Sequence, residues 1–210
     1  MPAPDLVGFV RGALPPPPAR VLEVGAGDGE LAAVLAGAGY EVVAIDPQPG
    51  SPDVRRVALH ELDETPFDAA VAVVSLHHVE PLEESCERLA QLVREGGRLV
   101  VDEFDVEQFD VRAARWWLEY QDDDRSEPAE LIAGHRRHLH SVARVREALS
   151  PWFDVGPAVL GPYLYRWKMP PDTRATEERL IAEGRIPAVG ARFVSRRSAS
   201  GGGPPRRPAR

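Results

Sequence analysis

Arg20-Val21-Leu22-Glu23-Val24 is a short apolar run, and Gly25-Ala26-Gly27-Asp28-Gly29 follows it directly. A strand that turns sharply into a helix needs glycines, because they adopt unusual backbone angles and let a ligand approach the main chain. The helix that begins at such a turn offers unpaired N–H groups and a partial positive charge. Apolar residues then recur at helical spacing over residues 29–38. The segment therefore predicts a strand, a ligand-binding turn and a helix.

Outward from this segment, predicted strands and helices alternate along the chain. Further strands are predicted at residues 41–46, 54–59, 67–75, 98–102, 153–160 and 189–196, and further helices at residues 81–94 and 173–183. The run at 67–75 is almost continuously apolar, as in a central strand that is covered on both faces. This alternation predicts an α/β fold with a doubly wound, mostly parallel sheet of seven strands and helices on both faces.

The chain divides into three predicted regions. Residues 1–19 combine a helix with the run Pro15-Pro16-Pro17-Pro18, which predicts an arm that either covers a ligand or packs on the domain edge. Residues 20–197 form the main domain, in which the polar, Trp-, His- and Arg-rich segment 106–150 predicts a helical lid over the substrate region. Residues 198–210 contain mostly Ser, Gly, Pro and Arg, which predicts a disordered tail.

Composition excludes several classes of protein. The 210 residues with 43% hydrophobic content suit one domain with a buried core. The net charge of -8 argues against general nucleic-acid binding, which needs a basic surface. Cys86 is the single cysteine, and the sequence has neither a signal peptide nor an apolar run of membrane-spanning length. We expect a cytoplasmic protein with no membrane partner, and the sequence carries no signal for its oligomeric state.

Three details narrow the ligand of the glycine turn. The spacing is Gly-x-Gly-x-Gly, whereas dinucleotide-binding turns have Gly-x-Gly-x-x-Gly. Glu23 would face a pyrophosphate badly, but its carboxylate suits a ligand that carries an ammonium and a sulfonium. Asp46 ends the second predicted strand, 21 residues after Gly25, where a carboxylate can accept both hydroxyls of an adenosine ribose. Together these details favour S-adenosylmethionine over a dinucleotide.

Over residues 20–105 the sequence resembles the class I S-adenosylmethionine-dependent methyltransferases, in particular their small-molecule branch. Residues 21–29 resemble the first motif of that family, and Val43-Ala44-Ile45-Asp46 resembles the second. Residues 67–79 resemble its fourth-strand motif, and residues 92–100 the segment that leads into its fifth strand. The resemblance implies a Rossmann-like fold with an antiparallel last strand, and methyl transfer from S-adenosylmethionine.

The resemblance also assigns residues to this cofactor. They are Glu23, Gly25, Ala26, Gly27, Asp46, Glu61, Leu62 and Ser75. It implies that Glu23 supports the turn and the methionine ammonium, that the turn itself gives room for the methionine part, and that Asp46 holds the ribose. Glu61 or Leu62 is expected near the adenine, with Asp63 as the weaker choice, and the backbone of Ser75 is expected beside the methionine part.

The acceptor is expected to be a small organic molecule, methylated by in-line SN2 transfer. No Asn/Asp-Pro-Pro-Tyr/Phe segment of the DNA- and protein-methylating branches follows the fourth strand, where Ser75-Leu76-His77-His78 stands instead. No Pro-Cys nucleophile of the cytosine C5 type is present either. A sulfonium methyl is already activated, so the protein must mainly align the acceptor and exclude water. A general base is needed only where the acceptor starts protonated.

No catalytic residue is assigned from the sequence. The candidates are His77, His78, Glu103, His138 and Tyr163. The two adjacent histidines follow the fourth strand and could accept a proton, orient the acceptor, or simply pack around the cofactor turn. Glu103 ends the fifth strand. His138 and Tyr163 belong to aromatic and imidazole-rich segments that suit a planar or cationic substrate, although the tryptophans there could equally pack on the sheet.

No metal site is expected. Two groups of side chains invite the idea: Asp102, Glu103 and Asp105 at the end of the fifth strand, and His135, His138 and His140 in the lid. Neither group has a complete ligand set that can be read from the sequence. The acidic residues could equally bind an arginine of the lid.

Two other functions are compatible with this sequence. An NAD(P)-dependent oxidoreductase shares the fold and an acidic strand end, but the glycine spacing, Glu23 and the lack of a Tyr-x-x-x-Lys pair disfavour it. A non-catalytic regulatory protein that binds S-adenosylmethionine would also keep a glycine turn. The intact turn and Asp46 favour a methyltransferase over this non-catalytic protein, because a site no longer in use would be expected to lose one of them.

Overall fold

A mixed β-sheet forms the centre of the computed structural model, which describes residues 4–121 and 126–199. Its strands are β1 Arg20–Val24, β2 Glu41–Asp46, β3 Arg55–Arg56, β4 Phe67–Val73, β5 Val93–Phe104, β6 Phe153–Val155, β7 Val159–Gly161 and β8 Gly190–Arg197. Their order is β3-β2-β1-β4-β5-β8-β6, and β7 also pairs with β8. The first five strands are parallel, and β8 runs antiparallel to β5, β6 and β7. The predicted doubly wound sheet with seven strand positions and an antiparallel last strand is therefore confirmed.

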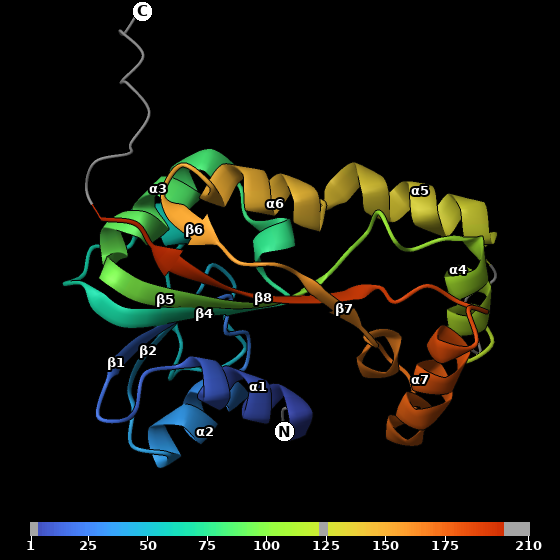
Figure 1. Ribbon diagram of the computed structural model, residues 1–210, viewed down its shortest axis with the longest axis horizontal. Coiled ribbons are helices and arrows are strands. Elements are labelled where there is room, and N and C mark those ends of the chain that lie inside the picture. The colour runs from blue at the N-terminus through green and yellow to red at the C-terminus, as the bar shows by residue number, and fades with distance from the viewer. Residues whose placement is uncertain (1–3, 122–125, 200–210) are drawn as a thin grey trace, which may run out of the picture.

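Helices cover both faces of this sheet, as predicted. They are α1 Pro4–Ala13, α2 Glu30–Gly37, α3 Leu82–Leu92, α4 Val111–Leu118, α5 Pro128–His138, α6 Val142–Leu149 and α7 Arg174–Ala182. In Figure 1, α1 and α2 lie on one face, whereas α3 and α6 lie on the other. Within the described ranges, no helix is both long enough and apolar enough to cross a membrane.

Successive residues of β1 show why this strand is apolar throughout. Val21 packs in the cluster that includes α1 and α2, and Leu22 packs in the cluster that includes α3 and α6. A strand covered on both faces has no solvent side, so its sequence is a continuous apolar run. Val10 of α1 is fully buried in the first of these clusters, so α1 packs against the sheet.

A separate aromatic cluster lies beyond the end of β5. It joins Phe104 of that strand to side chains from α4, α5 and the turn Leu164–Arg166. Trp117 and Trp167 stack with ring centroids 4.3 Å apart, and the Trp117 indole donates a hydrogen bond to the Trp167 carbonyl at 2.8 Å. The helical segment predicted at 106–150 contains α4, α5 and α6. Its tryptophans, Trp116 and Trp117, belong to this cluster at the end of the sheet, which was one of the two interpretations.

The third and sixth predicted strands are wrong in extent. The strand expected at 54–59 is reduced to the two-residue edge strand β3, because the chain turns at Leu59–Glu61 into a 3-10 turn. Short edge strands also limit unwanted pairing with other chains. The strand expected at 153–160 is split into β6 and β7. Pro157 lies in the gap and has no N–H to donate to a ladder.

The junction of α3 and β5 also differs from expectation. The helix predicted at 81–94 ends at Leu92, and β5 starts at once at Val93 rather than at Arg98. Its register against β4 shifts between Phe67 and Ala69, which marks an irregularity in the segment between Val93 and Arg98. Of the predicted disordered tail at 198–210, the part from residue 200 onward lies outside the described residues.

Candidate active site

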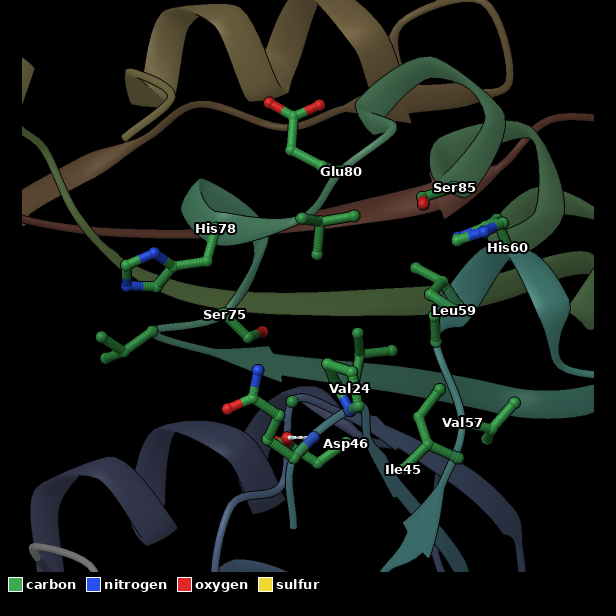
Figure 2. A pocket seen from close by; sticks show the side chains of 16 residues that line it. Val24, Ile45, Asp46, Val57, Leu59, His60, Ser75, His78, Glu80 and Ser85 are labelled. Atoms are coloured by element: carbon green, nitrogen blue, oxygen red, sulfur yellow. Dashed lines mark hydrogen bonds between the residues drawn. The ribbon is translucent and has the colours of Figure 1, made fainter. Parts of the chain in front are cut away.

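A cavity of about 510 Å³ opens where β1, β2 and β4 end. Its wall is formed by the last residues of β1 and β2, by residues 57–60, by the loop at 74–80 that follows β4, and by Ser85 of α3 (Figure 2). The carboxyl ends of parallel strands are the usual place for a ligand in an open α/β sheet. The cavity therefore lies where the glycine turn predicts a ligand site.

The glycine turn has two different requirements for glycine. Gly25 adopts φ +70°, and a Cβ atom there would lie 2.3 Å from the Cβ of Ser75. Gly27 adopts φ +54°, but a Cβ atom there would meet no atom within 4 Å. The N–H groups of Gly25 and Ala26 both donate to the Ile45 carbonyl, at 2.9 and 3.0 Å. The first residues of the turn are thus packed against β2 and the loop after β4, whereas the space around Gly27 is unfilled.

Asp46 lies at the end of β2 and lines the cavity (Figure 2). Its carboxylate accepts hydrogen bonds from the Gly27 N–H at 3.0 Å and the Gln48 N–H at 2.8 Å. Two carboxylate oxygens offer about four acceptor positions. Asp46 can therefore hold the glycine turn and still accept hydrogen bonds from ligand hydroxyls.

Glu23 is a buried carboxylate with one unpartnered oxygen, and the Ala32 backbone N–H donates a hydrogen bond to the carboxylate. It is 4% exposed, and its Oε2 has no hydrogen-bond partner among the described residues. Burial raises the pKa of Glu23 to about 7. The side chain borders a second hollow of about 210 Å³, which Leu6 of α1 also lines and which shares Gly25 with the main cavity. A ligand ammonium in this hollow would supply the charge that favours the ionised carboxylate.

The loop after β4 is anchored by Glu103, which is fully buried at the end of β5. Its carboxylate accepts from the N–H groups of Ser75 and Leu76, at 3.0 and 2.6 Å, and contacts Nδ1 of His77. Val74 lies just before Ser75 and has a φ of 52°. This left-handed conformation is rare for a β-branched residue. Glu103 therefore determines where the backbone of this loop lies.

His77 and His78 have different positions. His77 is buried, whereas His78 is exposed and lines the cavity (Figure 2). Their ring centroids are 4.2 Å apart. Partial burial, and next the charge of His77, lower the pKa of His78. A lowered pKa favours the neutral imidazole, which is the form that accepts a proton.

The expected adenine residues do not line the cavity. Glu61 is exposed, and Leu62 is buried in the main hydrophobic cluster. Ala58, Leu59 and His60 line the cavity instead. Sequence reasoning missed them because the segment was expected to continue as a strand to residue 59. Ser85 was missed too, because a serine within an amphipathic helix gives no signal of its own.

The remaining candidates lie apart from the cavity. His138 is exposed near the end of α5. Tyr163 is buried and stacks on Phe104 with ring centroids 5.2 Å apart, and this burial raises the pKa of Tyr163. The structure thus brings Gly25, Asp46, Ser75 and His78 to one cavity, and Glu23 and Ala26 to the hollow beside it.

The two groups considered for a metal have other partners. Asp102 pairs with Arg166 and Arg192, each at 2.5 Å. His135 contacts the Leu131 carbonyl at 2.8 Å. Throughout residues 4–121 and 126–199, no group of three or more His, Cys, Asp or Glu residues could hold a metal ion.

Comparisons with known proteins identify a family from the sequence and a common fold from solved structures. Residues 4–149 match the sequence model described as a methyltransferase domain. An uncharacterized methyltransferase of Mycobacterium bovis is 38% identical over 98 residues, covering 41% of this chain and 40% of that protein. The chain thus matches well under half the length of this curated relative.

Two solved structures show the same fold. One is the 1,6-didemethyltoxoflavin-N1-methyltransferase of Burkholderia thailandensis with bound 1,6-didemethyltoxoflavin and S-adenosylhomocysteine. It has 19% identity and a TM-score of 0.55, over 93% of this chain and 76% of that one. The other is an S-adenosylmethionine-dependent methyltransferase of Mesorhizobium loti, with 18% identity and a TM-score of 0.60, over 90% of this chain and 95% of that one.

Proposed function

The chain belongs to the class I S-adenosylmethionine-dependent methyltransferases, and from this premise we propose that it methylates a small organic acceptor. The observation that carries the proposal is the buried carboxylate of Glu23, which has an unpartnered oxygen and no cation beside it among the described residues, at the open glycine turn. A buried carboxylate without a cation is costly, so its presence here supports a ligand that brings a positive charge. The methionine ammonium of S-adenosylmethionine is such a charge.

The residues at the cavity fit this donor. We assign Asp46 to the ribose hydroxyls, because its carboxylate lines the cavity and keeps free acceptor positions. Glu23 is assigned to the ammonium, and Gly25 and Ser75 to the region between the two hollows. When bound, the donor supplies a methyl group on a positively charged sulfur, which is already activated for transfer.

The chain's own contribution is then mainly to position the acceptor and keep water out. Glu103 positions the loop that carries Ser75 and the two histidines. We assign His78 as the group that accepts a proton when the acceptor is a phenol, an alcohol or an ammonium. It lines the cavity, and its pKa is lowered.

A small acceptor is favoured over a macromolecule by the net charge of the protein and by the volume of the cavity. The net charge of -8 does not suit a polyanion. The cavity of about 510 Å³ is bounded by strand ends and loops, and its volume is typical of sites for small molecules (Figure 2). The Burkholderia thailandensis relative acts on 1,6-didemethyltoxoflavin, which is a small molecule.

The test combines binding with turnover. Calorimetry with S-adenosylhomocysteine should show binding to the wild type and at least tenfold weaker binding to Asp46→Ala, since this variant loses a charged hydrogen-bond acceptor. Asp53→Ala is the matched control, because Asp53 is exposed and does not line the cavity. Methyl transfer is then measured with a panel of phenols, amines and carboxylic acids.

The outcomes separate the possible functions. A wild type that binds no S-adenosylhomocysteine contradicts the proposal, and binding of NADH in its place would indicate an oxidoreductase. Binding of S-adenosylhomocysteine without transfer to any class of acceptor would indicate a regulatory protein.

A further inference from the structure

The loop that carries His78 is held from two sides. On the side that precedes His78 in the sequence, Glu103 of β5 accepts hydrogen bonds from the N–H groups of Ser75 and Leu76. On the other side, His140 lies in the short linker between α5 and α6 and makes two contacts with the loop. Two elements far apart in the sequence thus meet at the residue that faces the cavity.

The contacts of His140 flank His78. The His140 backbone N–H donates to the His77 carbonyl at 2.9 Å, and the His140 ring Nε2 lies 3.1 Å from the Val79 carbonyl oxygen. A carbonyl oxygen can only accept, so Nε2 carries the hydrogen and donates it. The same nitrogen is 3.0 Å from a carboxylate oxygen of Glu80, which is a second acceptor. One residue therefore holds the carbonyl groups on both sides of His78.

The linker that contains His140 joins two helices with different packing. Ile132 of α5 packs in the aromatic cluster beyond β5, whereas Val142 and Val145 of α6 pack in the cluster that includes α3. In Figure 1, α5 and α6 follow each other along the side of the sheet that α3 covers. Since each helix is fixed by its own core contacts, the half-buried His140 between them has a defined position from which to hold the loop.

We propose that His140 is a positioning residue, which holds His78 at the cavity in the orientation that lets it accept a proton. The inference rests on the proposed function, because it assumes that His78 is the proton acceptor. His78 is exposed, so packing of its own side chain does not fix its position (Figure 2). His140 does not line the cavity and therefore acts through the loop rather than on the ligand. A displacement of about 1 Å between reacting groups can cost on the order of a hundredfold in rate.

The first test is the titration of His78 in the protein without ligand, followed by NMR of isotope-labelled histidine. The signal of His78 is identified by its absence in His78→Gln. The ionisable groups around this side chain are His77, Glu80, Glu103, His135 and His140. Two variants separate the contact from the charge: His140→Phe removes both, whereas His140→Gln keeps an N–H donor and removes only the charge.

The two variants should titrate differently. Partial burial, and next the charge of His77, lower the pKa of His78 from its ordinary value of 6.5. In His140→Phe we expect this pKa to rise toward 6.5, because a looser loop lets water reach more of the ring. In His140→Gln it should stay closer to the wild-type value. His138→Phe makes the same chemical change two residues earlier, at an exposed position of α5, and should leave the titration as in the wild type.

The second test measures methyl transfer to an acceptor of the panel that the wild type methylates with loss of a proton. His140→Phe should lower kcat roughly 10- to 100-fold, and His140→Gln should recover most of that loss. Both variants should bind S-adenosylhomocysteine as the wild type does, because His140 lies outside the cavity wall. Thermal melting of each variant checks the fold.

Two results would overturn the inference. An unchanged titration of His78 in His140→Phe would mean that its position does not depend on His140. Equal shifts in His140→Phe and His140→Gln would mean that only the charge of His140 acts on His78. Neither result involves the donor, so both leave the proposed function standing, whereas a wild type that binds no S-adenosylhomocysteine would refute that function instead.

Discussion

The glycines of the turn differ in what a side chain would cost. Gly25→Ala adds a methyl group 2.3 Å from the Ser75 Cβ and forces a left-handed conformation on alanine. We expect this variant to lose about 3 kcal/mol of unfolding free energy or more, combining strain with overpacking. Gly27→Ala, with open space around the added methyl, should lose only about 1–2 kcal/mol from strain. Urea unfolding measures both, and equal losses would contradict the close packing at Gly25.

Glu23 makes the stability of the free protein depend on pH. Burial raises its pKa from 4.5 to about 7, so the folded state holds this proton more tightly than the unfolded state does. Stability from this group is therefore complete below pH 4.5 and is lost as the pH rises toward 7. Glu23→Gln should be more stable than the wild type at pH 8, by on the order of 3 kcal/mol, with a difference that shrinks toward pH 5.

Urea unfolding at several pH values between 5 and 8 checks this expectation. Glu84→Gln serves as the control, because Glu84 lies exposed on α3. A stability difference for Glu23→Gln that stays constant over this range would show that Glu23 does not titrate there. Added S-adenosylhomocysteine should reduce the difference if its ammonium pairs with the ionised carboxylate.

The sequence predicts those cavity residues whose positions are determined by a short stretch of neighbouring residues. The positions of Gly25 and Asp46 at the cavity follow from a turn and a strand end, which are short-range features. His60 and Ser85 reach the cavity only because α3 packs beside the turn after β3. Nothing in the spacing of these two residues encodes that contact, so it could not be read from the sequence.

Among the elements, the loop after β4 offers the sharpest test. Glu103→Gln keeps the shape of the side chain but places an amide where the carboxylate accepts from two N–H groups and contacts His77. We expect a loss of about 1–3 kcal/mol in stability and weaker binding of S-adenosylhomocysteine, because the Ser75 backbone would move. Calorimetry and urea unfolding give the two quantities.

Glu177 provides a matched control for this variant. It is also fully buried, and it accepts from the N–H groups of Tyr163, Leu164 and Tyr165, at 2.8, 3.0 and 2.9 Å. Glu177→Gln should lose similar stability but bind S-adenosylhomocysteine like the wild type. Equal effects of both variants on binding would mean that Glu103 supports the fold without positioning the ligand loop.

Strand and helix positions were predictable wherever one local pattern covered the whole element. The ends of β1, β2 and α2 lie within one residue of expectation, because apolar runs and glycines mark them. The prediction of a strand at 54–59 was wrong in extent because this segment lies at the edge of the sheet and pairs with one strand only. The chain leaves the sheet early and forms the 3-10 turn Leu59–Glu61, although its apolar pattern is typical of a longer strand. β6 and β7 are separate strands because Pro157 lies between them and has no N–H to donate to a neighbouring strand.

For the whole molecule, the proposed donor predicts a ligand-specific thermal shift. A ligand that binds only the folded state at a hundredfold excess over its Kd adds about 2.7 kcal/mol of stability. For a domain of this size, this corresponds to an increase in Tm of roughly 5–10 °C. S-adenosylhomocysteine should produce this increase, and NADH at the same concentration should produce none. A scanning-calorimetry trace with the opposite ranking would contradict the cofactor assignment.

The place of β8 has a consequence for synthesis on the ribosome. Among the described elements β8 is the last in sequence, yet it lies inside the sheet between β5 and the pair β6 and β7. While the nascent chain emerges, β5 has only β4 beside it, and the other two short strands have no partner at all. The half of the sheet that carries the glycine turn can therefore assemble first. The rest must wait, with the edge of β5 unprotected, until residues 190–197 leave the exit tunnel.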